Sequence, residues 1–423
     1  MPGDERWAEV VRTLGDRLLA LQRRIAILPA IRWPADVKRH FLRHRGRELP
    51  RVTRSTYDAS PLGFEPNGYD RDLRELQTAI AQALGRNTAA ARLLLQRCQA
   101  SRQTVAMLAA RGTRQFAAGA RLVFDVASGQ ETSTIHRLLN RLSAHARPAM
   151  QPPQSVTPGQ MRDLVTARVQ ATFPAPVAVA LADGMATRAA ARGRQIRLNR
   201  FARFARGDVE PLVAHECWLH LGSSFNARRQ PTCRFLGSAI ATATATQEGL
   251  AVLCEVLNAG IDLRRIQTLG VRFEAVQLVD CGADFRDVFR HLRDRGLDTE
   301  SAYDQAARVF RGSLPSGCGP FPRDRCYALG LARILAAAES AMAQQDWHTF
   351  LLLLCGKVGI QERPFLAQLV AEGILARPAF VPPPLRDARA IQELLRRIGS
   401  FDEIPRPSGD SRATILQAAP SRH

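Results

Sequence analysis

The sequence predicts a mostly helical α+β protein. Apolar residues at three-to-four spacing recur along most of the chain, as amphipathic helices require. Two short runs near the middle have strand character and predict a small mixed sheet. The 423 residues are enough for two domains, or for one large unit with a helical extension.

The N-terminal region, residues 1–146, is predicted to be helical. The run EVVRTLGDRLLALQRRIAIL (9–28) has helical spacing, which Pro29 and Pro34 then interrupt. Two more amphipathic patterns are LRELQTAIAQAL (73–84) and AAARLLLQRCQASRQTVAMLA (89–109). The Pro-rich polar stretch 147–160 is the predicted linker.

Residues 161–376 form the second predicted domain. PVAVALAD (176–183) predicts a strand, and the alternating run RQIRLN (194–199) predicts a half-exposed edge strand. VAHECWLH (213–220) and ATATATQEGLAVLCEVLNAG (241–260) have helical patterns. Residues 377–423 are predicted to hold one helix, within 385–400, and a mobile tail.

Composition excludes some classes of protein. A hydrophobic fraction of 46% excludes general disorder, and no run approaches the ~18 apolar residues of a membrane span. The N-terminus lacks an apolar signal core and the eight cysteines lack a CxxC pair, so we expect a cytoplasmic protein with reduced thiols. The net charge of +20, almost all arginine, suits nucleic acid, an anionic membrane surface or acidic peptides.

The segment VAHECWLH raises the question of a metal site. In a straight helix, residues five apart point about 140° apart, so His215 and His220 can share an ion only where the backbone is irregular, as at a π-bulge. On a regular backbone the segment is simply a buried helix. Glu248 in TQEGLA is a candidate third ligand, because catalytic zinc usually takes three protein ligands. Its alternative role is that of an exposed acid near a helix start.

Several segments together resemble a known family. They are HECWLH (215–220), NARRQP (226–231), TQEGLAVL (246–253), RVFRG (308–312) and FPRDRCYALG (321–330). They are similar to the QEGLA-motif proteins, which include the microtubule-associated tyrosine carboxypeptidases of animals and the bacterial flavohemoglobin expression-modulating QEGLA motif proteins. The resemblance covers residues 160–375 and implies a zincin-like metallopeptidase domain with one Zn²⁺ per chain.

The resemblance also implies residue roles. His215, His220 and Glu248 would hold the zinc ion, and Glu216 would act as general base on a zinc-activated water. Tyr327 is the candidate hydrogen-bond donor to the oxyanion; its alternative role is a half-buried core tyrosine.

A carboxypeptidase must also bind the free carboxylate of its substrate, and the two-pronged donor geometry of arginine suits this. Arg311 is the first candidate and Arg308 the second. Asn226 and Gln230 in NARRQP either hold the substrate backbone or fix the loop after the metal helix.

The chain departs from the family pattern in two places. Cys217, Trp218 and Leu219 stand where relatives usually have small residues such as Gly-Thr, and Ser223 stands where relatives tend to carry an arginine. A tryptophan can fill the pocket for the terminal side chain, so selectivity for tyrosine stays open.

A basic stretch precedes the metal helix: RAAARGRQIRLNRFARFAR (188–206) holds seven arginines and no acid. It is either a solvated face, or an attractor for an acidic peptide, or a nucleic-acid site. Three functions stay open: a zinc carboxypeptidase acting on a peptide or protein C-terminus, a non-catalytic metal-binding regulator, and a basic nucleic-acid-binding protein. No membrane partner is expected.

Overall fold

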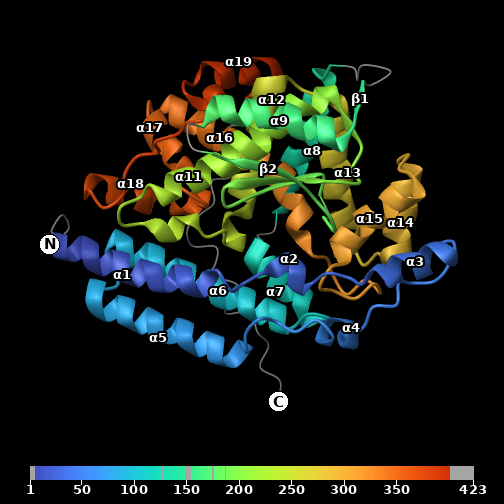
Figure 1. Cartoon of the computed structure of the whole chain (residues 1–423), viewed down its shortest axis with the longest axis horizontal. Coiled ribbons are helices and arrows are strands. Elements are labelled where there is room, and N and C mark those ends of the chain that lie inside the picture. Colours follow the sequence, from blue (N-terminus) through green and yellow to red (C-terminus); the bar gives the residue numbers. More distant parts are fainter. Residues whose placement is uncertain (1–4, 125–126, 148–153, 174–175, 186, 401–423) are drawn as a thin grey trace.

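The computed structural model describes residues 5–124, 127–147, 154–173, 176–185 and 187–400. It confirms the predicted α+β class, mostly helical with a small mixed sheet. Helices α1 to α7 lie along one side of the molecule, and α9, α12, α16 and α19 lie toward the other (Figure 1). The N-terminal helices are α1 (Glu5–Gln22), α2 (Ile27–Ala30), α3 (Ala35–Arg43), α4 (Arg54–Asp58), α5 (Pro66–Leu84), α6 (Ala89–Ala109), α7 (Gln115–Phe124) and α8 (Gly129–Ala144).

Two N-terminal helices follow the predicted periodicity. Helix α6 coincides with the predicted 89–109, and its N-cap residue Thr88 accepts a hydrogen bond from the N–H of Ala91. Helix α5 begins earlier than predicted because Glu65 caps it and Pro66 suits its first turn. The end of the predicted helix 9–28 is wrong. Helix α1 ends at Gln22, and Pro29 lies inside the short helix α2.

Five short strands follow in two sheets, and the three-stranded sheet has the order β2-β4-β3. The predicted edge strand RQIRLN is therefore wrong in position: β4 is the central strand, parallel to β2 and antiparallel to β3. Its alternation arises because Ile196 and Leu198 are buried in a cluster with residues of α9, while their neighbours face the other side. The elements are β1 (Ser155–Val156), α9 (Pro158–Thr172), β2 (Ala178–Ala182), β3 (Ala189–Arg192), β4 (Gln195–Asn199) and β5 (Phe204–Ala205).

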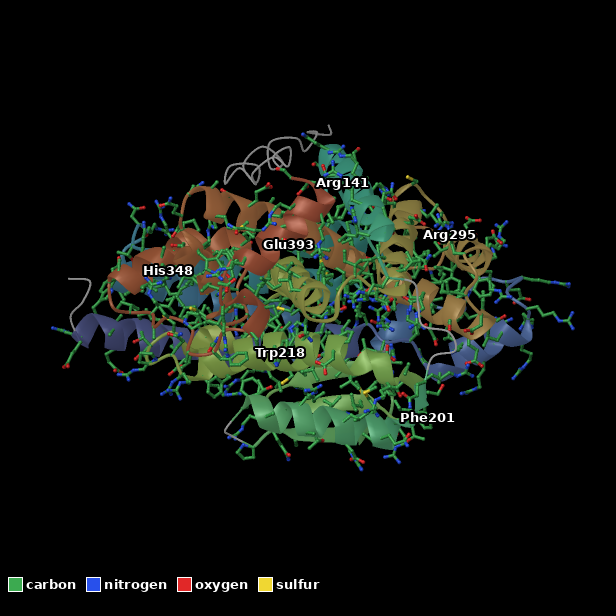
Figure 2. The ribbon with its side chains drawn as sticks, turned by 90° about the horizontal axis from the view of Figure 1, so that it is seen from above. Arg141, Phe201, Trp218, Arg295, His348 and Glu393 are labelled. Atoms are coloured by element: carbon green, nitrogen blue, oxygen red, sulfur yellow. The ribbon has the colours of Figure 1, made fainter. Side chains whose placement is uncertain are left out.

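The basic stretch 188–206 runs through β3, β4 and β5. Part of its charge is neutralised locally, because Arg188 pairs with Asp208 and Arg200 pairs with Asp183. Phe201, within the same stretch, is 78% exposed and lies at the edge of the molecule (Figure 2).

The N-terminal helices and the later helices share one hydrophobic core, to which α1, α5 and α6 contribute alongside α12 and α16. The predicted boundary between two domains stays a prediction. Residues 148–153 of the predicted linker and residues 401–423 of the predicted tail lie outside the described residues, whereas α19 confirms the C-terminal helix. The remaining long helices are α12 (Thr244–Ala259), α13 (Leu263–Asp280), α14 (Phe285–Asp294), α15 (Thr299–Phe310), α16 (Cys326–Ala343), α18 (Arg363–Ala371) and α19 (Arg389–Ile398).

Helices α12 and α16 cross at close range through two glycines. A Cβ atom on Gly249 would lie 2.7 Å from Gly330 Cα, and one on Gly330 would lie 2.8 Å from the carbonyl carbon of Ala245. The segment Pro322–Ala343, which contains α16, has the length and mean hydropathy (1.2) of a membrane span, but 61% of that window is buried inside the structure. Helix α16 is therefore a core helix, and its close contact with α12 holds α12 in position.

Gly330→Ala is expected to lower the free energy of unfolding by about 1–3 kcal/mol or more, because the added methyl group overlaps backbone atoms that cannot move aside. The matched control is Gly270→Ala in α13, where the nearest atom to a new Cβ is Leu139 Cδ1 at 3.8 Å. That change should be neutral or slightly stabilising, since alanine favours a helix. Chemical denaturation measures both. Equal stabilities would mean that α12 and α16 lie further apart.

Candidate metal centre and active site

The segment between α10 (Val209–Leu212) and α11 (Gly222–Arg228) is a π-helix, Val213–Leu221. In a π-helix each N–H donates to the carbonyl five residues earlier, as the N–H of Gly222 does to Cys217 O. This register aligns residues five apart, so the rings of His215 and His220 lie together, with centroids 4.8 Å apart. The backbone irregularity that the spacing of the two histidines demands is therefore present.

Glu248 reaches both histidines from α12. Its Oε2 lies 3.4 Å from His215 Nε2 and 3.7 Å from His220 Nε2. That oxygen is buried and accepts no hydrogen bond from the described part of the chain, whereas Oε1 accepts one of 2.9 Å from Arg323. Leaving a buried carboxylate oxygen unpartnered is costly, and a metal ion would satisfy it. The three ligand atoms lie within 4.8 Å of one another, which fits metal–ligand bonds of about 2 Å.

A second carboxylate supports the first histidine. Glu255 Oε1 lies 2.5 Å from His215 Nδ1, and Arg265 holds Glu255 through bonds of 2.7 and 2.9 Å. Such a partner on Nδ1 leaves Nε2 free as a metal ligand. Burial raises the pKa of Glu255, but Arg265 and His215 outweigh it and lower the pKa to about 2.

The two histidines differ in protonation when no metal is bound. Burial acts to lower the pKa of His215, but the neighbouring carboxylates of Glu248 and Glu255 hold it well above the usual value. Burial and the charge of Lys357 lower the pKa of His220. A metal ion must therefore displace a proton from His215, which couples metal binding to pH.

Glu216 comes from the same π-helix and is 8% exposed. Its Oε2 accepts a hydrogen bond of 2.7 Å from the N–H of Ala191 on β3. Strand β3 is thus the edge strand next to the metal ligands, in place of the predicted RQIRLN. The ring of Tyr327, on α16, lies nearly parallel to that of His215 at 6.5 Å, and its hydroxyl makes no hydrogen bond to any described residue.

The sequence profile of the microtubule-associated tyrosine carboxypeptidase family matches residues 39–402, most of the chain. The chain belongs to this family. No curated protein sequence matches the chain. The profile extends beyond the QEGLA segments to nearly all the helices that surround the metal ligands, and it makes the chain a member of a carboxypeptidase family.

The two arginines predicted to bind the substrate carboxylate, Arg308 and Arg311, have different surroundings from each other. Arg308 is buried, and it donates two hydrogen bonds of 2.6 and 2.5 Å to Asp324. Its role as a substrate ligand stays a prediction, although Asp324 already engages the Nε and Nη2 groups of Arg308. Arg311 is half-buried and has no ion pair or hydrogen bond to any described residue. Burial and Arg308 lower its pKa to about 10.

Arg272, which the sequence did not indicate, is a second arginine without a carboxylate hydrogen-bond partner among the described residues. Burial and Arg308 lower its pKa to about 10, although Asp324 opposes them. Its Nε donates to Gln305 Oε1 at 3.1 Å, and its guanidinium lies 5.6 Å from the ring centroid of Tyr327. Two half-buried cations without a carboxylate hydrogen-bond partner among the described residues favour an anionic ligand, and Arg272 places one of them beside Tyr327.

Asn226 and Gln230 fix the loop after the metal helix. Asn226 donates to Leu354 O and Phe380 O and accepts from Phe380 N, at 2.7–2.9 Å. Gln230 makes a similar pair of 2.9 Å bonds with the backbone of Ala376. These bonds favour the alternative that Asn226 fixes the loop, and its assignment to substrate binding stays a prediction.

The residues that depart from the family pattern are mainly packing residues. Burial raises the pKa of Cys217 to about 12, which argues against a nucleophile. The indole N–H of Trp218 donates to Thr172 Oγ1 at 3.3 Å, so the ring lies against α9 (Figure 2). Ser223 is 1% exposed, and its hydroxyl makes no hydrogen bond within the ranges that the structure describes.

Lys357 is a further site residue that sequence reasoning missed. Its Nζ donates to His220 O at 2.8 Å, and burial lowers its pKa to about 8 although Glu216 and Glu248 oppose this. A signal existed in the sequence, because the arginine-rich chain contains only two lysines. A buried ion pair fixes its backbone: Arg97 donates to Lys357 O and to both oxygens of Glu362, at 2.8–2.9 Å.

Glu362→Gln is expected to cost about 3–5 kcal/mol of stability, because it leaves Arg97 as an uncompensated buried charge. The control is Glu393→Gln, which removes an exposed pair with Arg396 and Arg397 and should change stability by no more than about 0.5 kcal/mol. Thermal or chemical unfolding separates the two. A small effect of Glu362→Gln would mean that water reaches the pair.

Proposed function

We propose that this chain is a zinc-dependent carboxypeptidase that hydrolyses the C-terminal peptide bond of a peptide or protein. The observation that carries the proposal is the convergence of His215 Nε2, His220 Nε2 and the unpartnered Glu248 Oε2. Two imidazoles and one carboxylate form a ligand set that zinc hydrolases use, with the fourth position left for water or substrate. Membership of a carboxypeptidase family supports the reaction class.

Zinc bound there would supply a Lewis acid that polarises the scissile carbonyl and acidifies a water molecule. The chain's own residues do the rest. Glu216, directed by the N–H of Ala191, takes the proton from the attacking water and passes it to the leaving amine. Tyr327 has a free hydroxyl to donate to the developing oxyanion. Lys357 adds positive charge near Glu216.

The substrate's own carboxylate would bind to the under-compensated arginines. Arg311 is the first candidate, because its charge interacts with Arg323, which contacts Glu248. Arg272, beside Tyr327, is the second. A carboxylate in this region would receive the charge-assisted hydrogen bonds that these buried cations lack. We also propose that an extended substrate pairs with strand β3, as substrates do in zincin-like peptidases. A cytoplasmic location likewise stays a proposal.

Elemental analysis after dialysis against metal-free buffer is expected to find about one zinc per wild-type chain. Glu248→Ala should lose most of it, since a buried ligand is removed. Glu216→Gln should keep the zinc yet lower turnover of a peptide library by about 10²–10⁴-fold. Wild-type protein that takes up no zinc contradicts the proposal. If the protein binds zinc but shows no turnover, or if its turnover is unaffected by Glu216→Gln, the result favours the non-catalytic regulator.

Arg311→Met is expected to lower kcat/KM for peptides with a free C-terminus by about 10–100-fold, which corresponds to losing a charged hydrogen bond of about 1.5–3 kcal/mol. C-terminally amidated peptides should already be poor substrates, and the variant should not affect them further. Arg290→Met, an arginine 71% exposed on α14, is the control and should behave as wild type. An equal loss for both peptide types would assign Arg311 to folding.

A further inference from the structure

A second group of metal-ligating side chains lies at the end of α3. His40 and His44 occupy positions four apart, which face the same side of a regular helix. Glu48 joins them from the turn that follows. One ligand atom from each of the three lies within 4.8 Å of the others. At the metal centre above, by contrast, a spacing of five needs a π-helix to achieve the same convergence.

The histidine nitrogens are free in the way that a metal ligand requires. His44 Nδ1 lies 2.9 Å from His40 O and donates to it, so the lone pair of His44 is on Nε2. His40 Nε2 is buried and has no hydrogen-bond partner among the described residues. Its distance of 3.6 Å to Glu48 Oε2 is too long for a hydrogen bond. The centroids of the His40 and His44 rings lie 4.1 Å apart.

The backbone after α3 brings the carboxylate back over the helix. Arg45 (φ 53°) and Gly46 (φ 73°) both adopt the left-handed conformation, which is uncommon for a residue with a side chain. The N–H of Gly46 donates to Phe41 O, and this bond closes the turn.

We infer that His40, His44 and Glu48 form a second binding site, for a divalent transition-metal ion of the zinc class. Two imidazoles and a carboxylate suit Zn²⁺, Co²⁺, Ni²⁺ and Cu²⁺ rather than Mg²⁺ or Ca²⁺. The ion joins the last turn of α3 to the turn at residues 45–48. Binding is weaker than at the buried centre, because Glu48 is 51% exposed and Arg51 lies 3.5 Å from it and competes.

The test uses the full chain without a polyhistidine tag, dialysed as above and then titrated with Co²⁺ by calorimetry and visible absorption. Wild type is expected to take up one equivalent more than it carries in the buried centre. His40→Gln/His44→Gln should lose that equivalent, and Glu48→Gln should weaken it at least about tenfold. Arg51→Ser should tighten it, because the competing cation is gone.

His348→Gln is the control, since it removes an exposed histidine elsewhere (Figure 2) and should leave the extra equivalent in place. Glu248→Ala, which removes a candidate ligand of the buried centre, should also keep the extra equivalent of Co²⁺. The test therefore distinguishes this inference from the proposed function. Uptake that persists in His40→Gln/His44→Gln, or no extra equivalent in wild type, overturns the inference. Glu48→Gln changes only a surface side chain and so provides the answer if the double variant does not fold.

Discussion

The candidate active site depends on the π-helical register of residues 213–221. In a regular α-helix His215 and His220 would face different sides, and Glu248 could meet only one of them. The π-register turns both toward α12 and presents Glu216, between them, to the edge of β3. The close crossing of α12 and α16 at Gly249 then sets how near Glu248 comes to the histidines. Backbone geometry, rather than residue identity alone, makes the motif capable of holding a metal.

Around these ligands the buried charges form a connected network. Glu255 holds His215 and is itself held by Arg265, while Arg323 turns Glu248 so that one oxygen stays free. Partners of this kind fix the orientation of a ligand before a metal arrives. The positive charge beside Tyr327 would favour anionic substrates, in keeping with the proposed carboxypeptidase.

Periodicity and capping were enough to predict the long helices, as α6 illustrates with bounds that match its apolar pattern. The order of strands was not accessible, because one buried face produces the same alternation in central β4 as in an edge strand, and alanine-rich β3 has little strand signal. At the site, the spacing of the two histidines left an ordinary buried helix open, and it was the family resemblance that implied His215, His220 and Glu248 as candidate metal ligands. Their supporting partners escaped prediction: Arg323 is remote in sequence, and Glu255, two turns after Glu248, carries no motif.

The lysine at the site is informative because the chain uses arginine almost everywhere else. Arginine holds Asp324, Glu362 and Glu255 through paired, planar hydrogen bonds, a geometry that lysine cannot reproduce. Lys357 instead makes one bond, to His220 O, and places a compact charge near Glu216 and Glu248. An arginine there would bind a carboxylate through two donors and could draw Glu216 away from the substrate. A single ammonium group supplies charge without imposing that geometry, which leaves the general base free to move a proton.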